Sequence, residues 1–361
     1  MRSTKLLIVL FISSLGLVGS YLLRKEEETD YHELQIEAVN KTQEAFNKIK
    51  AKRLELGIPI DSILDPLETG MIGQDLTIGV YSITTTVGKL EAKRTSTNPN
   101  FTALLIRYLK SLNIKKGDSV ALNFSGSFPA INIEAMIAVQ TLELNSFVCS
   151  SIGASMFGAN FVGFNYLDME LHLFDEGLLH KKSDLVSLGG ENDNLDMTYN
   201  DDSFKYELYN RYFPHYEFLR ELDYNKNIDY RYGLYNNKLG NIKAFINVGG
   251  NLVSNGKGLN SYPNGLTRRM SVDVNRNSGL IELFLRDDVP LINLLNIEDL
   301  AARNEMEYDS NTLYEIGVGS MYYDFKYPIY LIIIPFVLCF GFMGYDNIKR
   351  KEETIGEIMI A

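Results

Sequence analysis

Glycine and serine residues stand where several predicted strands of this sequence end. They occur at residues 125–127, 150–155, 189–190 and 249–250. In an open α/β sheet such turns meet at the carboxyl edge, where ligands bind. Glycine lets the backbone approach a ligand, and amides with serine hydroxyls hold carboxylate or phosphate oxygens. The turns predict a ligand crevice that includes Ser125, Gly126, Ser127, Ser151, Gly153, Ser155, Gly189, Gly190, Gly249 and Gly250.

Acidic residues near these turns are candidates for acid–base chemistry. Asp168 and Glu170 lie in one cluster, and Glu191 and Asp193 follow the pair of glycines at 189–190. Carboxylates there could act as a general base, hold a cation or accept hydrogen bonds from an amine. The alternative is a solvated face of an acidic protein. The candidates for catalysis are Ser127 and Ser151 as nucleophiles, and Asp168 and Glu170 as acid and base.

Several chemistries are disfavoured by spacing. The turn at 125–129 lacks the glycines of a dinucleotide fingerprint or P-loop, and no Gly-x-Ser-x-Gly elbow occurs, so no cofactor is predicted. His172 and His180 flank a predicted helix and are eight residues apart, too far for one zinc ion, so no metal site is predicted. Cys149 lies in an apolar stretch and is interpreted as a buried strand residue rather than a nucleophile.

Composition indicates a folded acidic protein. The chain has 361 residues, a hydrophobic fraction of 45%, 22 tyrosines, 19 phenylalanines and no tryptophan. Its net charge of −11 disfavours sequence-independent binding of nucleic acid, which depends on clustered Lys and Arg. The two cysteines, 149 and 339, give no disulfide framework.

The elements that would position the crevice alternate between strands and helices. Such alternation predicts an α/β fold, a mostly parallel, Rossmann-like sheet with helices on both faces. The predicted strands span residues 77–85, 119–124, 146–150, 185–188 and 244–248, with a further one at 268–274. The predicted helices span residues 31–56, 100–112, 131–142, 165–178, 203–212, 227–235 and 291–305.

Two apolar runs flank this region, at residues 6–23 and 328–345. Each is long enough for a transmembrane helix, and basic residues beside them predict that both termini are cytoplasmic. The alternative for the first run is a cleavable signal peptide. The predicted organisation begins with a cytoplasmic N-terminus at 1–5, a transmembrane helix or signal anchor at 6–23, and a membrane-proximal helix and linker at 24–75. An extracytoplasmic α/β domain follows at 76–327, with a possible break near 255–265. The chain then has a transmembrane helix at 328–345 and a cytoplasmic tail at 346–361.

Four motifs in this order resemble the poly-gamma-glutamate system protein family, membrane-anchored proteins associated with the synthesis and export of that polymer. The motifs are NFSGSFP at 123–129, SSIGAS at 150–155 with GAN at 158–160, LDME at 167–170, and NVGG at 247–250. The resemblance adds Asn160 and Asn247 to the expected binding residues. Phe157 stands where the family commonly has Trp, and Asn251 where it has Gly, which puts a ligand contact at Asn251 in doubt.

The resemblance implies an accessory component of capsule or cell-envelope poly-gamma-glutamate synthesis or export that works with the membrane-embedded synthase. The residues fit a binder of a carboxylate-bearing polymer or its end group, with Lys181 and Lys182 or Arg268 and Arg269 as basic spots. Because an acidic domain repels a polyanion, such binding would be local. One alternative is a hydrolase or transferase of γ-glutamyl amide bonds, and another is a non-catalytic scaffold for the synthase.

Overall fold

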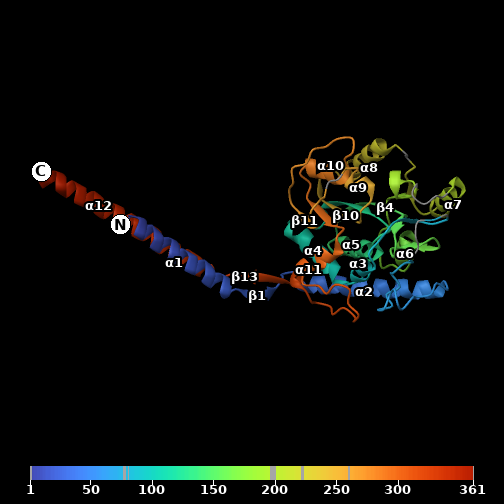
Figure 1. The fold of residues 1–361 in the computed structure, drawn as a ribbon, viewed down its shortest axis with the longest axis horizontal. Coiled ribbons are helices and arrows are strands. Elements are labelled where there is room, and N and C mark those ends of the chain that lie inside the picture. The colour runs from blue at the N-terminus through green and yellow to red at the C-terminus, as the bar shows by residue number, and fades with distance from the viewer. Residues whose placement is uncertain are drawn as a thin grey trace. The chain divides into compact units, whose positions relative to one another are not determined.

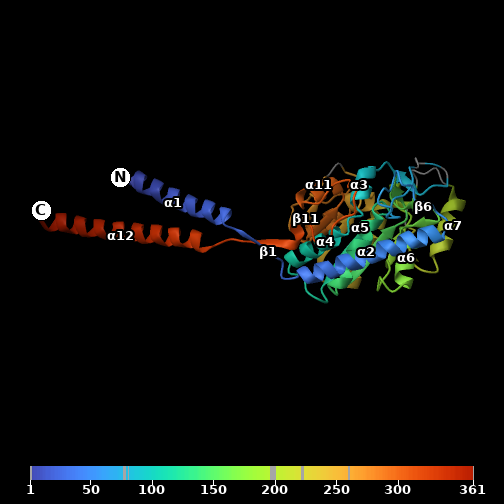
Figure 2. The ribbon, with the colours of Figure 1, turned by 90° about the horizontal axis from the view of Figure 1, so that it is seen from below.

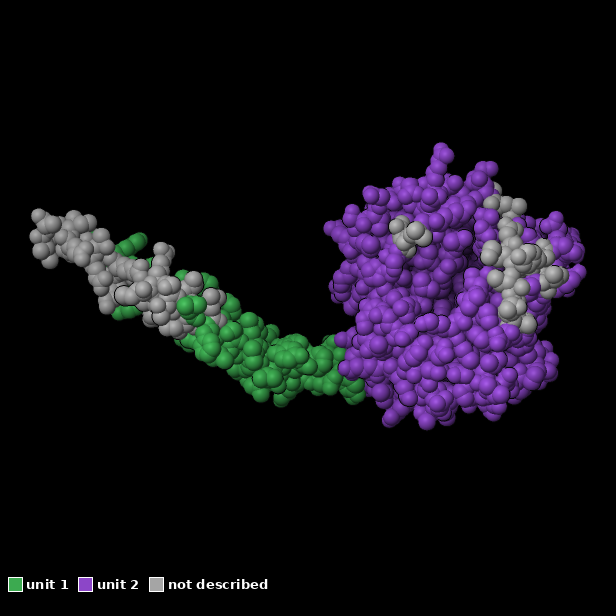
Figure 3. Space-filling model, in the orientation of Figure 1, with its two compact units in different colours: residues 1–30, 323–361 green, residues 31–322 purple. Residues whose placement is uncertain are grey.

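The computed structural model describes residues 2–75, 79, 81–195, 201–220, 223–258 and 261–360. The chain divides into two compact units, which are distinguished by colour in Figure 3. The first consists of residues 1–30 and 323–361, and the second of residues 31–322. The second unit includes the described residues around 255–265, where the sequence suggests a possible break.

The first unit contains two helices and a two-stranded antiparallel sheet. Its elements are α1 (Arg2–Leu22), β1 (Lys25–Glu28), β13 (Tyr323–Lys326) and α12 (Tyr330–Ile360), and β1 pairs with β13. Gly16 lets the helices pack closely, since a Cβ there would lie 2.3 Å from the carbonyl oxygen of Leu331.

The prediction of two transmembrane helices is wrong. Within the described residues, neither of these helices nor any other combines the length and apolarity needed to cross a bilayer.

A mixed seven-stranded sheet forms the centre of the second unit in the described part of the chain. Its order is β11-β12-β10-β3-β4-β8-β9, and every neighbouring pair is parallel except β11 with β12. The strands are β3 (Ser119–Phe124), β4 (Asn145–Ser151), β8 (Leu185–Ser187), β9 (Glu217–Phe218), β10 (Ile242–Val248), β11 (Gly265–Thr267) and β12 (Leu291–Leu294).

Helices cover both faces of this sheet (Figure 1). One face packs on α8 and α10 through an apolar core in which the Phe245 and Phe284 rings stack at 4.3 Å. The opposite face is covered by α4 and α5, and α2 runs outside them in contact with α4, α5 and α6 (Figure 2). The helices are α2 (His32–Glu55), α4 (Asn100–Ser111), α5 (Pro129–Thr141), α6 (Tyr166–Asp175), α7 (Asp202–Tyr212), α8 (Tyr224–Leu239) and α10 (Leu280–Arg286).

Short elements join the main helices and strands of the second unit. They are α3 (Leu90–Thr95), the α9 turn (Leu252–Asn255), α11 (Ile297–Arg303) and two 3-10 turns (Glu191–Asp193 and Ser320–Tyr322). Two small sheets pair β2 (Thr84–Thr86) with β5 (Ala154–Ser155) and β6 (Asn160–Phe161) with β7 (Phe164–Asn165).

Three predicted elements differ from the structure. The expected helix at 291–305 is the buried strand β12 followed by α11, because its first four residues pair with β10. No strand forms at 268–274, and the edge strand is β11 just before it. The expected strand at 77–85 falls partly on residues outside the described ranges, and residues 84–86 form β2, which pairs with β5 and not with the main sheet.

The strand order places a topological switch point between β3 and β10. From β3 the chain passes through α5 to β4 on one side, whereas α8 leads back to β10 on the other side of β3. At such a point neighbouring connections leave in opposite directions, so a crevice opens outside the carboxyl ends of the strands. The turns after β3 and β10 border this crevice.

Glu134 on α5 is a buried carboxyl group far from water. Neither of its carboxyl oxygens has a hydrogen-bond partner among the described residues. Burial raises the pKa of this carboxyl well above its ordinary value. The native state therefore holds a proton that the unfolded chain releases above about pH 4.5, and the free energy of unfolding falls as pH rises through that value toward the native pKa.

Replacing Glu134 with Met should remove this pH dependence. We expect the Glu134→Met chain to gain stability over the wild type as pH rises from about 5 to 8, by up to about 1.4 kcal/mol per pH unit. Urea unfolding followed by circular dichroism at several pH values measures the difference. The exposed Glu207→Met change is the control, and an equal pH effect in both variants would contradict the assignment.

Candidate functional site

A pocket of about 650 Å³ lies at the switch point. Its walls come from the turns after β3, β4, β8 and β10, from the segment between β2 and α3, and from the start of α11. Seven hydroxyl side chains line it, those of Thr85, Thr86, Ser125, Ser127, Ser151, Ser155 and Tyr308. Its volume is within the range of small-molecule sites, roughly 300–1,000 Å³.

The structure brings many of the predicted binding residues to this pocket. Those that line it are Ser125, Ser127, Ser151, Gly153, Ser155, Gly190, Glu191 and Gly250. Those that do not line it are Gly126, Asn160, Gly189, Asp193, Asn247 and Gly249. The second group supports the turns from behind.

Gly126 shows how closely these turns pack on one another. Its amide donates to the carbonyl oxygen of Gly153 at 3.2 Å, and its own carbonyl accepts from Ala159 at 2.9 Å. A Cβ on Gly126 would lie 2.7 Å from the carbonyl oxygen of Ile152. This glycine therefore allows two backbone turns to contact each other, whereas the sequence predicted a contact with the ligand.

Asn247 and Asn160 also hold the backbone. The Asn247 side-chain amide donates to the Gly249 carbonyl and to the Asn293 side chain, both at 3.0 Å. Asn160 accepts from the Gln74 amide at 2.7 Å and donates to its carbonyl at 2.9 Å. Asn251 lines the pocket, yet its side-chain oxygen accepts from the Ser254 amide at 2.9 Å as the cap of α9.

Lys93 is a buried charged residue in the wall of this pocket that the sequence did not predict. Its side chain comes from α3, only 3% of the residue is exposed, and Nζ donates to the Ser127 carbonyl at 2.5 Å. Nζ also lies 3.4 Å from the centre of the Phe128 ring. Among the described residues Lys93 makes no ion pair. Burial lowers the pKa of its ammonium well below the ordinary value.

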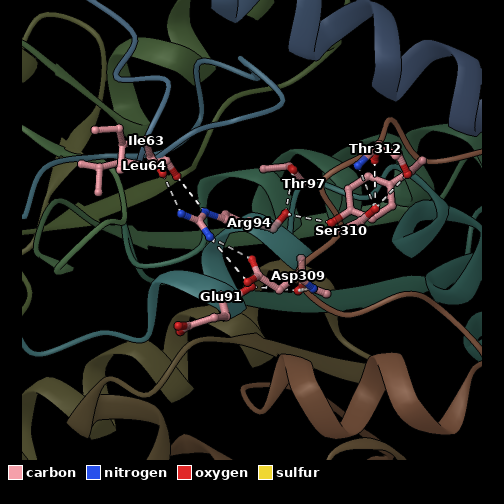
Figure 4. A network of polar contacts seen from close by, with 10 residues as sticks. Ile63, Leu64, Glu91, Arg94, Thr97, Asp309, Ser310 and Thr312 are labelled. Carbon is pink, nitrogen blue, oxygen red and sulfur yellow. Dashed lines mark hydrogen bonds and ion pairs between the residues drawn. The ribbon is translucent and has the colours of Figure 1, made fainter.

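Two chain segments clamp the short helix that carries Lys93 (Figure 4). The Arg94 guanidinium donates to the carbonyls of Leu64 at 2.9 Å and Ile63 at 2.8 Å, and pairs with Asp309 at 3.2 Å. The Asp309 amide donates to the Thr95 hydroxyl at 2.8 Å. Since these bonds hold the two residues that follow Lys93 on α3, the amine is held against the pocket by the fold and does not depend on one flexible loop.

The predicted acid–base pair is not part of the pocket. Asp168 caps α6, accepting from the Asn165 amide at 2.9 Å and pairing with Arg211 at 2.8 Å. Glu170 is fully buried and accepts from the Ser183 amide and hydroxyl at 3.0 and 2.7 Å. Burial raises the pKa of both carboxyls. Their bonds to neighbouring chain segments give both residues structural roles in this fold.

Glu191 and Asp193 have different surroundings although they are two residues apart. Glu191 is exposed and lines the pocket. Asp193 is buried, pairs with Arg231 at 2.5 Å and accepts from the Ser187 hydroxyl and the Asn227 amide. A further contact of Asp193, with the Gly189 amide at 3.1 Å, shapes the turn that carries Glu191.

The serines of the pocket lack the partners of a histidine-activated nucleophile. No histidine lines the pocket among the described residues, and His180 lies in a separate small pocket. The Ser127 hydroxyl accepts from the Ser155 amide at 3.0 Å, and the Ser151 hydroxyl donates to the Phe124 carbonyl at 3.3 Å. Cys149 is buried in β4, where burial raises the pKa of its thiol to about 11.

Comparison of the chain with protein-family models, curated proteins and solved structures finds no match. The resemblance to the poly-gamma-glutamate family therefore stays a prediction.

Gly249 combines a left-handed backbone with a close approach to the turn after β3. It has a φ of +85°, and a Cβ there would lie 2.6 Å from the Ser125 hydroxyl oxygen. We expect Gly249→Ala to lower the free energy of unfolding by about 1–2 kcal/mol for the left-handed backbone, and by a further 1–3 kcal/mol or so for the overlap. Urea unfolding measures the sum of the two effects.

Gly240→Ala is the matched control. Gly240 has a φ of +66° at the end of α8, and nothing lies within 4 Å of the point where a Cβ would stand. Its substitution should lower the free energy of unfolding only by the contribution of the left-handed backbone. Equal destabilisation by the two changes would mean that the turns after β3 and β10 do not pack as described.

Proposed function

We propose that this pocket binds a ligand through a carboxylate at Lys93, and that the chain acts as a binding component in the synthesis or export of γ-linked glutamate polymers. The observation that carries the proposal is the buried amine of Lys93 in the wall of an open pocket, without an ion pair among the described residues. Burying an unpaired ammonium is unfavourable, and a ligand carboxylate would supply the missing partner. The ligand class is part of this proposal. The partners and the extracytoplasmic location remain predictions.

The charges of the pocket favour a single carboxylate over a phosphate. The other lysine in the lining, Lys89, already pairs with Glu298 at 3.4 Å. One ammonium among neutral hydroxyls matches one negative charge, and the hydroxyls can donate to carboxylate oxygens. A doubly charged phosphate would leave the second charge without a cation.

Size and net charge favour an end group over the length of a polymer. The pocket holds about 650 Å³, and the chain carries a net charge of −11 that repels a polyanion at long range. A terminal glutamyl unit brings one carboxylate to the amine while the rest of the polymer stays in solvent. The exposed carboxylate of Glu191 in the lining would repel further negative charge near the pocket.

Lys93→Met in the full chain separates a binding role from a structural one. We expect affinity for short γ-linked glutamate oligomers to fall by about 1.5–3 kcal/mol, or roughly 10- to 100-fold, because a charge-assisted bond is lost. Stability should stay equal or rise. Since the pKa of Lys93 is lowered on folding, the native state binds fewer protons and the buried amine reduces stability below about pH 10.5.

Lys116→Met is the control for net charge, because Lys116 is exposed at the opposite edge of the sheet, before β3. It should leave the affinity unchanged. Calorimetric titration and urea unfolding of the same samples give both quantities. Unchanged binding by Lys93→Met would contradict the proposal, and reduced stability with unchanged binding would assign Lys93 to holding the Ser127 turn.

A further inference from the structure

Among the described residues the Lys93 amine donates one hydrogen bond, so its other N–H bonds can donate to a ligand. Nζ donates to the Ser127 carbonyl at 2.5 Å and lies 3.4 Å from the centre of the Phe128 ring. The Ser155 hydroxyl oxygen and Lys93 Cε approach the same point, lying 3.1 and 3.4 Å from where a Cβ on Gly88 would stand. The amine and this hydroxyl therefore border the same part of the pocket.

None of the charged groups around the pocket in the described part of the chain forms an ion pair with the Lys93 amine. The lining also holds Lys89, Glu191 and Glu298, with the phenol of Tyr308. Glu91 and Arg94 lie on α3, and Asp309 contacts it. Lys89 pairs with Glu298, and Arg94 with Asp309. Burial is the cause of the lowered pKa of Lys93.

We propose that a carboxylate entering this pocket causes Lys93 to take up one proton from solvent, so that the empty site holds a neutral amine and the occupied site an ammonium–carboxylate pair. This inference rests on the proposed function and specifies its chemistry. The ligand enters as its carboxylate anion, the proton comes from the buffer, and no covalent bond changes. The occupied pocket thus has the same net charge as the empty one.

Proton uptake gives the binding a defined pH dependence. The desolvated amine loses its proton at a pH well below the ordinary range of lysine, whereas a carboxylate beside it favours the charged form. Between the two pKa values the affinity falls as pH rises, by up to about tenfold per pH unit. Ligand is therefore held at lower pH and released as the pH increases.

Calorimetric titration of the full chain tests the inference at about pH 9, where an ordinary lysine is still mostly protonated. The probe is N-acetylated γ-glutamylglutamate, which has no titratable amine, so any proton taken up at this pH goes to the protein. Titrations in two buffers of different ionisation enthalpy give the number of protons. We expect an uptake close to one per ligand, and an affinity that decreases from pH 8 to 9.5 or so.

Two variants assign the proton to Lys93. Lys93→Arg carries a permanent charge, so its binding should involve no proton uptake. If that variant does not bind, the residual binding of Lys93→Met at higher probe concentration should also lack uptake. Lys116→Met should behave as the wild type does.

The outcomes separate this inference from the function on which it rests. Binding of the probe by the wild type without proton uptake would overturn the inference and leave carboxylate binding intact. Uptake that persists in either Lys93 variant would also overturn it, because another group would then be the acceptor. Absence of binding by the wild type would overturn both.

Discussion

The buried amine of Lys93 is the constraint that the architecture around the pocket has to satisfy. An ammonium taken out of water without a counter-ion is so unfavourable that the group tends to give up its proton. Here the Ser127 carbonyl and the face of Phe128 are its partners, and α3 is fixed by Arg94 on the next position of the helix. A fold that needed only stability would have an apolar side chain at this position, as an unpaired buried charge lowers stability.

The turns around the amine owe their shape to contacts between backbones. Gly126 and Gly249 stand where a methyl group would overlap a neighbouring turn, and Asn247 ties the turn after β10 to β12. These residues lie behind the pocket, and the serines and threonines face it. The small-residue motifs therefore combine two roles, since the glycines allow the turns to meet and the hydroxyls between them form the polar wall.

Local patterns predicted much of the sheet, because β3, β4 and β10 are apolar runs that end in glycine or serine turns. They failed where contacts between distant segments determine the secondary structure. Residues 291–294 have a helical spacing, which did not reveal their pairing with β10. The same limit applies to Asp168 and Glu170, which are bound by partners distant in sequence. Lys93 gave no signal, since a lysine among Glu, Lys and Arg is typical of a solvated helix, and its burial depends on turns far along the chain.

A crystal structure of the full chain with N-acetylated γ-glutamylglutamate tests most directly whether Lys93 holds a carboxylate. We expect a ligand carboxylate oxygen about 2.7–2.9 Å from Lys93 Nζ, the usual length of a charge-assisted bond, with further hydrogen bonds from hydroxyls of the pocket. A ligand bound elsewhere on the chain, or bound in the pocket with its carboxylates directed to solvent, would contradict the assignment of Lys93 as the carboxylate partner.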